Sequence, residues 1–147
     1  MIKQSPMTEV YLREYFGHDK FRPGQREVID SILAGKNTIA IFPTGGGKSL
    51  CYQIPALILP GTTVVISPLI SLMKDQVDEL IGRTIPATYI SSILSDREVE
   101  RRIGELEKGQ YKIVYIAPER FYSEPFLEAL SSIHISFVAI DEAHCIS

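Results

Sequence analysis

The stretch TIAIFPTGGGKS, residues 38–49, decides the fold. It predicts a short buried strand over Thr38–Phe42, then a glycine-rich loop, then the start of a helix. Glycines carry no Cβ, so their backbone N–H groups can turn toward phosphate oxygens. The N-terminus of the following helix adds a partial positive charge. This order of elements is typical of a phosphate-binding loop.

Each residue of the loop has a predicted role. Lys48 can reach the β- and γ-phosphates of a nucleotide, and the Ser49 hydroxyl can ligate Mg²⁺. One position departs from the general pattern, because Phe42 stands where a glycine usually precedes the core by five residues. The alternative is a glycine-rich turn that binds nothing, which the strand, loop and helix order disfavours. The predicted phosphate-binding residues are Thr44, Gly45, Gly46, Gly47, Lys48 and Ser49.

Apolar runs and helical patterns alternate along the rest of the chain. Runs with β-branched residues suit strands that are covered on both faces. The alternation predicts an α/β fold with an open, mostly parallel sheet and helices on both faces. Ligands of such sheets bind beyond the carboxyl ends of the strands. Further strands are predicted at Thr62–Ser67, Thr84–Ser91, Tyr111–Ala117 and Ile135–Asp141.

Apolar side chains at 3.6-residue spacing predict the helices. The first helix is expected over Met7–Phe16, with Met7, Tyr11 and Tyr15 on its buried face. Gly35 is expected to end the second helix. The remaining buried stripes are predicted from Val28, Ile29, Ile32 and Leu33, from Leu69, Leu72, Met73, Val77, Leu80 and Ile81, and from Val99, Ile103 and Leu106.

Composition narrows the class of protein. The chain has 147 residues, a length that fits one domain, and a net charge of −3. A protein that coats nucleic acid over its whole surface is usually basic, so any nucleic-acid contact must be local. Cys51 and Cys145 show no metal-ligand spacing, which favours a reduced intracellular protein. No apolar run approaches the roughly 20 residues that span a bilayer, so no membrane association is expected.

Two carboxylates follow the last predicted strand. Asp141 is expected to hold Mg²⁺ through water, and Glu142 to orient or deprotonate an attacking water. An acidic pair after an apolar run can also be a solvated loop, but its combination with a phosphate loop favours a catalytic pair. His144 stays open between a structural or surface histidine and a group that couples to Glu142.

Several motifs together resemble one helicase family. Asp141-Glu142-Ala143-His144 resembles the signature of DEAH-type helicases, and Cys145-Ile146-Ser147 resembles its continuation in RecQ-type DNA helicases. The segments similar to other RecQ motifs are residues 16–17 with 21–25, 43–56, 65–77 and 115–120. The resemblance covers residues 16–147 and implies the first RecA-like motor lobe of an ATP-dependent DNA helicase.

The resemblance implies further binding residues. Gln25 would read the adenine edge and favour ATP over GTP, and Arg22 would lie on or beside the base. A solvated helix residue is the physical alternative for Gln25, and a surface ion pair with an acid is the alternative for Arg120. The resemblance also implies contacts with one strand of DNA by Ser67, Pro68, Leu69, Pro118, Glu119 and Arg120.

The family pattern also sets expectations for the whole protein. Residues 1–147 would form an incomplete first lobe, followed by a second lobe whose arginine reaches the γ-phosphate. Such an arginine contributes about 10³–10⁵ in rate, so the 147 residues alone would bind ATP with little turnover. The complete helicase would move 3′ to 5′ on DNA, in the cytoplasm or nucleoid of a bacterium or in a eukaryotic nucleus. The alternatives are an RNA helicase, another DEAH-type translocase and a non-catalytic nucleotide-binding module.

Overall fold

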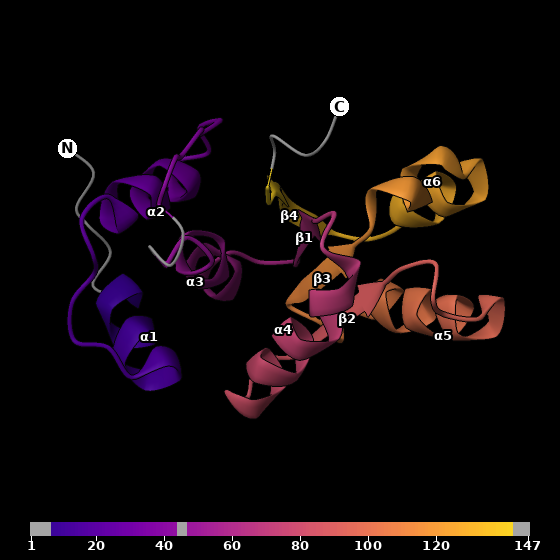
Figure 1. The fold of residues 1–147 in the computed structure, drawn as a ribbon, viewed down its shortest axis with the longest axis horizontal. Coiled ribbons are helices and arrows are strands. Elements are labelled where there is room, and N and C mark those ends of the chain that lie inside the picture. Colours follow the sequence, from indigo (N-terminus) through magenta and orange to yellow (C-terminus); the bar gives the residue numbers. More distant parts are fainter. Residues whose placement is uncertain (1–6, 44–46, 143–147) are drawn as a thin grey trace. The chain divides into compact units, whose positions relative to one another are not determined.

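The structure, a computed structural model, describes residues 7–43 and 47–142. The chain divides into two compact units, residues 1–60 and residues 61–147. Figure 1 shows the first unit in indigo and purple and the second in colours from magenta to yellow.

The first unit is helical in its described part. Its helices are α1 (Met7–Phe16), α2 (Gln25–Leu33) and α3 (Leu50–Ile58). Both α1 and α2 contact α3. Each helix contributes one large, fully buried aliphatic side chain, namely Leu12, Ile29 and Ile54. Gly35 directly follows the cap of α2 with a φ of 77°, which confirms the predicted end of this helix.

The bounds of α1 are confirmed, but its predicted buried face is wrong. Thr8, Leu12 and Phe16 are buried, whereas Met7 is 46% exposed. Tyr11 and Tyr15 are half-buried, with ring centroids 5.5 Å apart. Two overlapping stripes at helical spacing occur in this sequence. Packing against α3 selects the stripe that carries Leu12 and Phe16.

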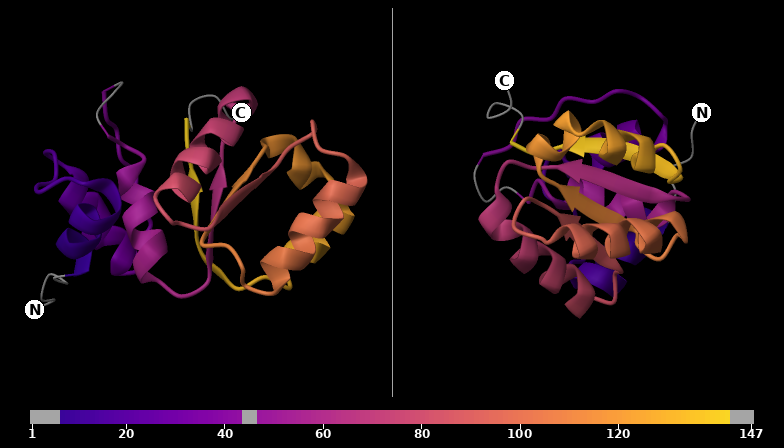
Figure 2. Two further views of the ribbon diagram at one scale, coloured as in Figure 1. Left: turned by 90° about the horizontal axis from the view of Figure 1, so that it is seen from below. Right: turned by 90° about the vertical axis from the view of Figure 1, so that its right-hand side faces the viewer.

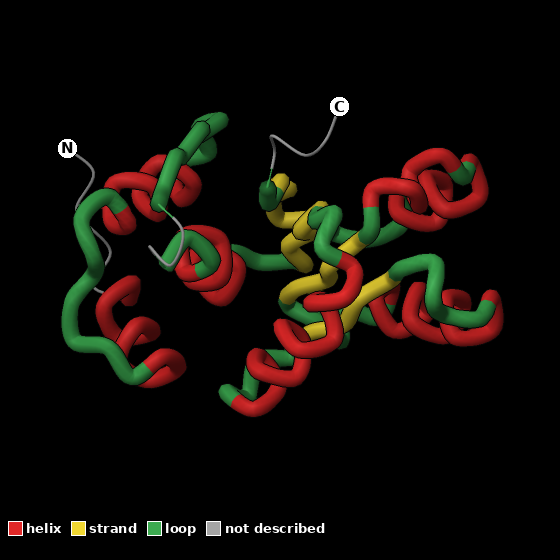
Figure 3. Tube along the Cα trace, viewed as in Figure 1, coloured by secondary structure: helices red, strands yellow, loops and turns green. Residues whose placement is uncertain are grey.

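The strand predicted at Thr38–Phe42 is not present. Figure 3 draws the described part of the segment between α2 and α3 as loop, and Ile39 and Ile41 are 94% and 93% exposed. A strand needs a neighbouring strand to satisfy its backbone N–H and C=O groups. The described part of the first unit contains no such neighbour. The apolar sequence therefore remains without the sheet that would bury it.

The second unit contains a four-stranded sheet. All three strand pairs are parallel, in the order β2-β3-β1-β4. This arrangement confirms the predicted α/β fold with a parallel sheet. The strands are β1 (Thr62–Ile66), β2 (Ala87–Ile90), β3 (Ile113–Ile116) and β4 (Ile135–Ile140). The strand predicted over Thr84–Ser91 is shorter than expected, because Thr84 has a φ of 65° and Pro86 has no N–H.

Helices cover both faces of this sheet, as predicted. Figure 2 shows α4 (Ile70–Gly82) on one face and α5 (Asp96–Glu107) and α6 (Glu124–Leu130) on the other. Between β3 and α6 lies a short 3₁₀ helix, η1 (Pro118–Tyr122). Right-handed crossovers explain the two faces, because the chain moves from β1 to β2 in one direction across the sheet and back to β3 in the other.

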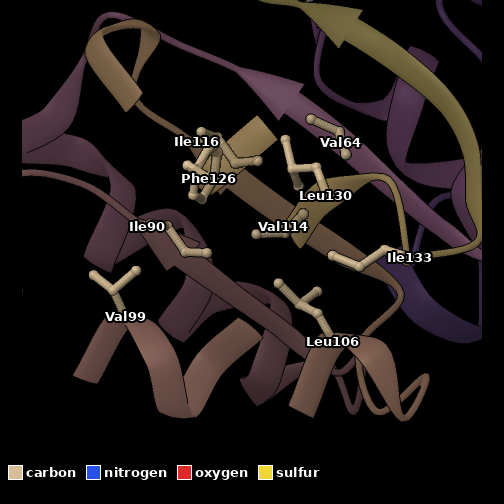
Figure 4. Close-up of a cluster of buried hydrophobic side chains, with 9 residues drawn as sticks. All are labelled: Val64, Ile90, Val99, Leu106, Val114, Ile116, Phe126, Leu130 and Ile133. Carbon is tan, nitrogen blue, oxygen red and sulfur yellow. The ribbon is translucent and has the colours of Figure 1, made fainter. Parts of the chain in front are cut away.

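The core beside α5 and α6 is a continuous apolar cluster (Figure 4). It brings sheet residues such as Val114 and Ile116 against Val99 and Leu106 of α5 and Phe126 of α6. On α4 the predicted stripe is too wide. Met73, Val77 and Leu80 are buried, whereas Leu72 and Ile81 are 47% and 55% exposed.

Candidate nucleotide-binding site

Gln25 links the start of α2 to the phosphate loop. Its side-chain Oε1 accepts a hydrogen bond from the Arg22 backbone N–H at 2.8 Å. Its Nε2 donates to the Gly47 carbonyl oxygen at 2.8 Å, across 22 positions of sequence. Gln25 is only 1% exposed, so the alternative of a solvated helix residue is excluded. The amide holds two separate loops of the first unit together.

Gly47 is required at its position for two reasons. Its φ is +76°, a left-handed conformation that side chains rarely adopt. A Cβ added there would lie 2.5 Å from Gln25 Nε2 and 3.7 Å from Arg22 Cδ. The glycine therefore allows Gln25 and the exposed residue Arg22 to approach the end of the phosphate loop closely.

The residues after Gly47 begin a helix, as predicted. Leu50 N–H donates to the Gly47 carbonyl at 3.3 Å, and Cys51 N–H donates to the Lys48 carbonyl at 3.1 Å. Lys48 is exposed. Ser49 stands at the N-cap of α3, but its hydroxyl makes no capping hydrogen bond. That hydroxyl is therefore not committed to the helix. The predicted loop residues Thr44, Gly45 and Gly46 lie outside the described residues.

Asp141 and Glu142 follow the last residue of β4. Asp141 N–H donates to the Ile66 carbonyl at 2.9 Å, which extends the β1–β4 ladder by one step. Glu142 N–H donates to Asp141 Oδ1 at 3.0 Å, and Glu142 has a φ of 54°. Such a conformation costs a residue with a side chain about 1–2 kcal/mol. Strained positions of this kind cluster at functional sites. His144 lies outside the described residues.

The carboxyl ends of the strands meet at one edge of the sheet. Ser67 N–H donates to the Ile116 carbonyl at 3.2 Å, so the segments that follow β1 and β3 begin side by side. The first leads to α4 and the second to η1 and α6, on opposite faces. Neighbouring strands whose connections leave to opposite faces form a topological switch point, where α/β proteins bind ligands.

This switch point holds the residues predicted to contact nucleic acid. Ser67 is buried and its Oγ accepts a hydrogen bond from Leu69 N–H at 3.2 Å, with Pro68 half-buried between them. On the η1 side, Pro118 is half-buried and Glu119 is exposed. Six residues named from sequence resemblance therefore gather in two adjoining loops.

Among the residues that the structure describes, Arg120 forms no ion pair with an acid, which was the alternative considered for it. In the part of the chain that the structure describes, its only hydrogen bond from the guanidinium goes to a backbone carbonyl, that of Ser91, at 2.8 Å. Lys74, on α4, does pair with an acid, since its Nζ lies 2.6 Å from Asp78 Oδ2. This exposed pair raises the pKa of Lys74 above its usual range.

Cys51 is a core residue and not a reactive thiol. Burial raises its pKa to about 11, so the thiol stays protonated at neutral pH. The other cysteine of the sequence, Cys145, lies outside the described residues. Within the ranges 7–43 and 47–142, no group of three or more histidine, cysteine or acidic residues could hold a metal. In the same ranges, no helix is long and apolar enough to cross a membrane.

The hydrogen bond between Gln25 and Gly47 was not predicted. Sequence patterns gave each residue a role toward a ligand, adenine for one and phosphate for the other. The glycine and the glutamine lie 22 positions apart, and no periodic pattern joins them. Only the packing of α2 against α3 shows that the two residues belong to one site.

Comparison with known proteins gives one consistent result. Residues 22–147 match the family model for DEAD/DEAH box helicases. The chain is 57% identical over 137 residues to the ATP-dependent DNA helicase RecQ of Bacillus subtilis, covering 92% of this chain and 23% of that protein. It is 52% identical over 146 residues to RecQ of Pasteurella multocida, covering 99% of this chain and 23% of the relative.

A third relative, RecQ of Haemophilus influenzae, is 45% identical over 146 residues, which cover 99% of this chain and 24% of that protein. The chain thus spans about a quarter of the length of these curated relatives. The family model covers most of the chain, including the described part of the phosphate loop and the acidic pair. The α/β fold and the switch point agree with that match. The chain belongs to the DEAD/DEAH box helicase family.

Proposed function

We propose that the chain is the ATP-binding first lobe of a RecQ-type, ATP-dependent DNA helicase. The observation that carries this proposal is the buried Gln25 amide, which joins the start of α2 to the end of the phosphate loop. It joins the residue proposed to read the base to the backbone proposed to bind phosphate. The similarity to RecQ proteins supports DNA as the nucleic acid.

The remaining hydrogen-bonding capacity of Gln25 supports a preference for adenine. A glutamine amide has two N–H donors and two acceptor lone pairs. Among residues 7–43 and 47–142, Gly47 and Arg22 use one of each, which leaves one donor and one acceptor. Adenine offers the matching N7 acceptor and N6 amino donor, whereas guanine offers two acceptors on the same edge. Arg22, close to Gly47, would pack beside the base.

Lys48 and Ser49 would bind the phosphates and their metal. Lys48 supplies the positive charge for the β- and γ-phosphates. Mg²⁺ commonly takes only one or two protein ligands beside phosphates and waters, so it needs no cluster of acids. The Ser49 hydroxyl, which makes no capping hydrogen bond to α3, and the Asp141 carboxylate suit that role, Asp141 through water. When bound, Mg²⁺ would neutralise charge on the transferred phosphoryl group.

Glu142 would act on the water that attacks the γ-phosphate. A carboxylate within reach of that water can orient it or accept its proton. The left-handed backbone of Glu142 fixes where its side chain leaves the strand end. His144 would couple this group to the rest of the motor. These roles complete the proposed hydrolytic set of Lys48, Asp141, Glu142 and His144.

The switch point supports a contact with one strand of DNA. Hydroxyl and backbone N–H groups in the loops of Ser67, Pro68 and Leu69, and of Pro118, Glu119 and Arg120, suit phosphate oxygens. We further propose that a second RecA-like lobe closes on this one, that the complete helicase moves 3′ to 5′, and that it works in the nucleoid or nucleus. The isolated 147 residues would bind ATP with little turnover.

The direct test is calorimetric titration of the chain with Mg·ATP and with Mg·GTP. We expect ATP to bind more tightly, and Lys48→Ala to abolish binding while the circular dichroism spectrum is unchanged. Lys36→Ala is the matched control, because Lys36 is also exposed and follows α2 in the same unit. Its affinity should equal that of the unaltered chain.

The outcomes separate the parts of the proposal. Equal affinities for ATP and GTP would remove the adenine assignment of Gln25 and keep the phosphate loop. Retention of binding in Lys48→Ala would contradict the phosphate loop itself. ATP binding without DNA-stimulated hydrolysis in a protein that carries both lobes would favour the non-catalytic nucleotide-binding module.

A further inference from the structure

Arg120 connects the loop after β3 to the loop after β2. Its Nη2 donates to the Ser91 carbonyl oxygen at 2.8 Å, across 29 positions of sequence. The same carbonyl accepts the Leu94 N–H at 3.3 Å, and Ala117 N–H donates to the Ile90 carbonyl at 3.1 Å. The two loops are thus joined at their first residues, and the guanidinium supplies the side-chain part of that joint.

The joint contains polar groups without partners. Among residues 7–43 and 47–142, neither Ser91 Oγ nor Arg120 Nε has a hydrogen-bond partner, although both atoms are buried. Ser91 is fully buried, and Arg120 is half-buried. Buried polar groups are usually paired, and exceptions occur where the chain has a task other than stability. The buried Nε and the hydrogen bond from Nη2 to the Ser91 carbonyl therefore direct this part of the guanidinium toward the loop after β2.

We propose that Arg120 is a positioning residue, which fixes the loop after β2 against the loop after β3, and that its charge does not bind a DNA phosphate. This inference rests on the proposed function, since it concerns loops proposed to contact DNA. It replaces a direct phosphate contact by Arg120 with a contact made by the backbone N–H and hydroxyl groups that Arg120 holds in place. The β1 side of the edge needs no such residue, because Ser67 Oγ orders its own loop through Leu69.

The first experiment measures the joint without any ligand. Amide hydrogen exchange of the chain is followed by NMR in Arg120→Met and Arg120→Lys. Methionine keeps the aliphatic stem and removes every donor, so the Leu94 and Ala117 amides should exchange about tenfold faster. Lysine can donate one hydrogen bond to the Ser91 carbonyl and should restore part of the protection. The Val65 amide in the central strand should not change.

The second experiment measures binding of an oligothymidylate at several salt concentrations. The slope of log affinity against log salt is negative, and each lost phosphate contact on a single strand reduces its magnitude by about 0.7. We expect Arg120→Met to weaken binding about tenfold at every salt concentration with an unchanged slope, and Arg120→Lys to recover part of the affinity. Arg97→Met, at an exposed arginine of α5, is the control for a general loss of charge. Affinity for Mg·ATP should be unaltered in all three.

The results separate this inference from the proposed function. If the magnitude of the salt slope decreases by about 0.7 in Arg120→Met but not in Arg120→Lys, Arg120 is a phosphate ligand and the inference is overturned. Unchanged exchange at Leu94 and Ala117 would also overturn it, because the side chain would then hold nothing. Absence of oligothymidylate binding by the unaltered chain would instead contradict the proposed DNA contact, and the exchange experiment would still decide whether Arg120 positions the loops.

Discussion

Two segments of this chain have nearly the same sequence character and different structures. TIAIF, residues 38–42, and TTVVI, residues 62–66, are both five-residue apolar runs that begin with threonine. The second is β1, which pairs with β3 and β4 and has Val65 fully buried. The first is a loop in which Ile39 and Ile41 are more than nine-tenths exposed.

The difference shows how each unit holds its functional residues. In the second unit, a ladder of backbone hydrogen bonds carries Ser67 and Asp141 to the same edge of the sheet. In the first unit, where the described residues form no ladder, one buried side chain performs the equivalent task. Gln25 fixes Gly47 through a single hydrogen bond. Loss of one hydrogen bond should therefore disturb the strand ends of the second unit less than it disturbs the phosphate loop. A change inside the central strand is the exception.

The largest effect is expected from a charge placed in each apolar run. Val65→Asp puts an unpaired carboxylate into the centre of the sheet and should lower the free energy of unfolding by about 3–5 kcal/mol. Ile41→Asp changes an exposed side chain and should alter it by less than about 0.5 kcal/mol. Urea unfolding followed by circular dichroism measures both. Similar losses in the two variants would show that residues 38–42 are buried in solution.

A smaller effect is expected from a methyl group at Gly47. Gly47→Ala combines an unfavourable φ with displacement of the Gln25 amide, so we expect a loss of about 2–4 kcal/mol and no detectable Mg·ATP binding. Gly104→Ala is the matched control, because Gly104 lies inside α5 with no atom within 4 Å of the added Cβ. That control should gain about 0.5–1 kcal/mol. Normal ATP affinity in Gly47→Ala would disprove the steric argument.

Removing the Gln25 amide is expected to have a smaller effect on stability than the methyl group at Gly47. Gln25→Met keeps a side chain of similar length and deletes both hydrogen bonds, so we expect a loss of about 1–2 kcal/mol in stability. ATP and GTP should then bind with equal, weakened affinity in calorimetry. Gln110→Met, at an exposed glutamine of the second unit, should change neither quantity. A retained preference for ATP in Gln25→Met would assign base reading to another residue.

The smallest effect is expected from the ion pairs of Glu98 on α5. These pairs belong neither to the backbone ladder of the sheet nor to the hydrogen bonds of Gln25. Hydrogen bonds from Arg101 and Arg102 lower the pKa of Glu98 from 4.5 to about 2. A lowered folded-state pKa stabilises the protein above pH 4.5, and that contribution is lost as the pH falls toward 2. Melting temperatures of the chain and of Glu98→Gln should differ slightly at pH 7 and converge near pH 2. A constant difference would contradict this pairing.

Much of the second unit could be predicted because its signals are local and repeated. Apolar runs that contain β-branched residues marked β1, β3 and β4. The carboxylates were assigned to the end of a strand from their order alone. The face of α1 and the width of the α4 stripe could not be predicted correctly. The pair Leu12 and Phe16 and the pair Tyr11 and Tyr15 both have the spacing of a buried helical face. Only the contact of α1 with α3 distinguishes them.

The sequence was sufficient for the helix that begins after Gly47, for the position of the acidic pair at the end of a strand and for the parallel α/β class, because residue spacing and strand alternation are properties of neighbouring residues. Tertiary structure decided which apolar run becomes a strand, that Gln25 is buried against Gly47, and that Arg120 faces Ser91. These features depend on contacts between residues far apart in the chain. A strand requires a partner for its backbone, and a buried polar side chain requires one for its hydrogen bonds, so neither can be specified by a short stretch of sequence.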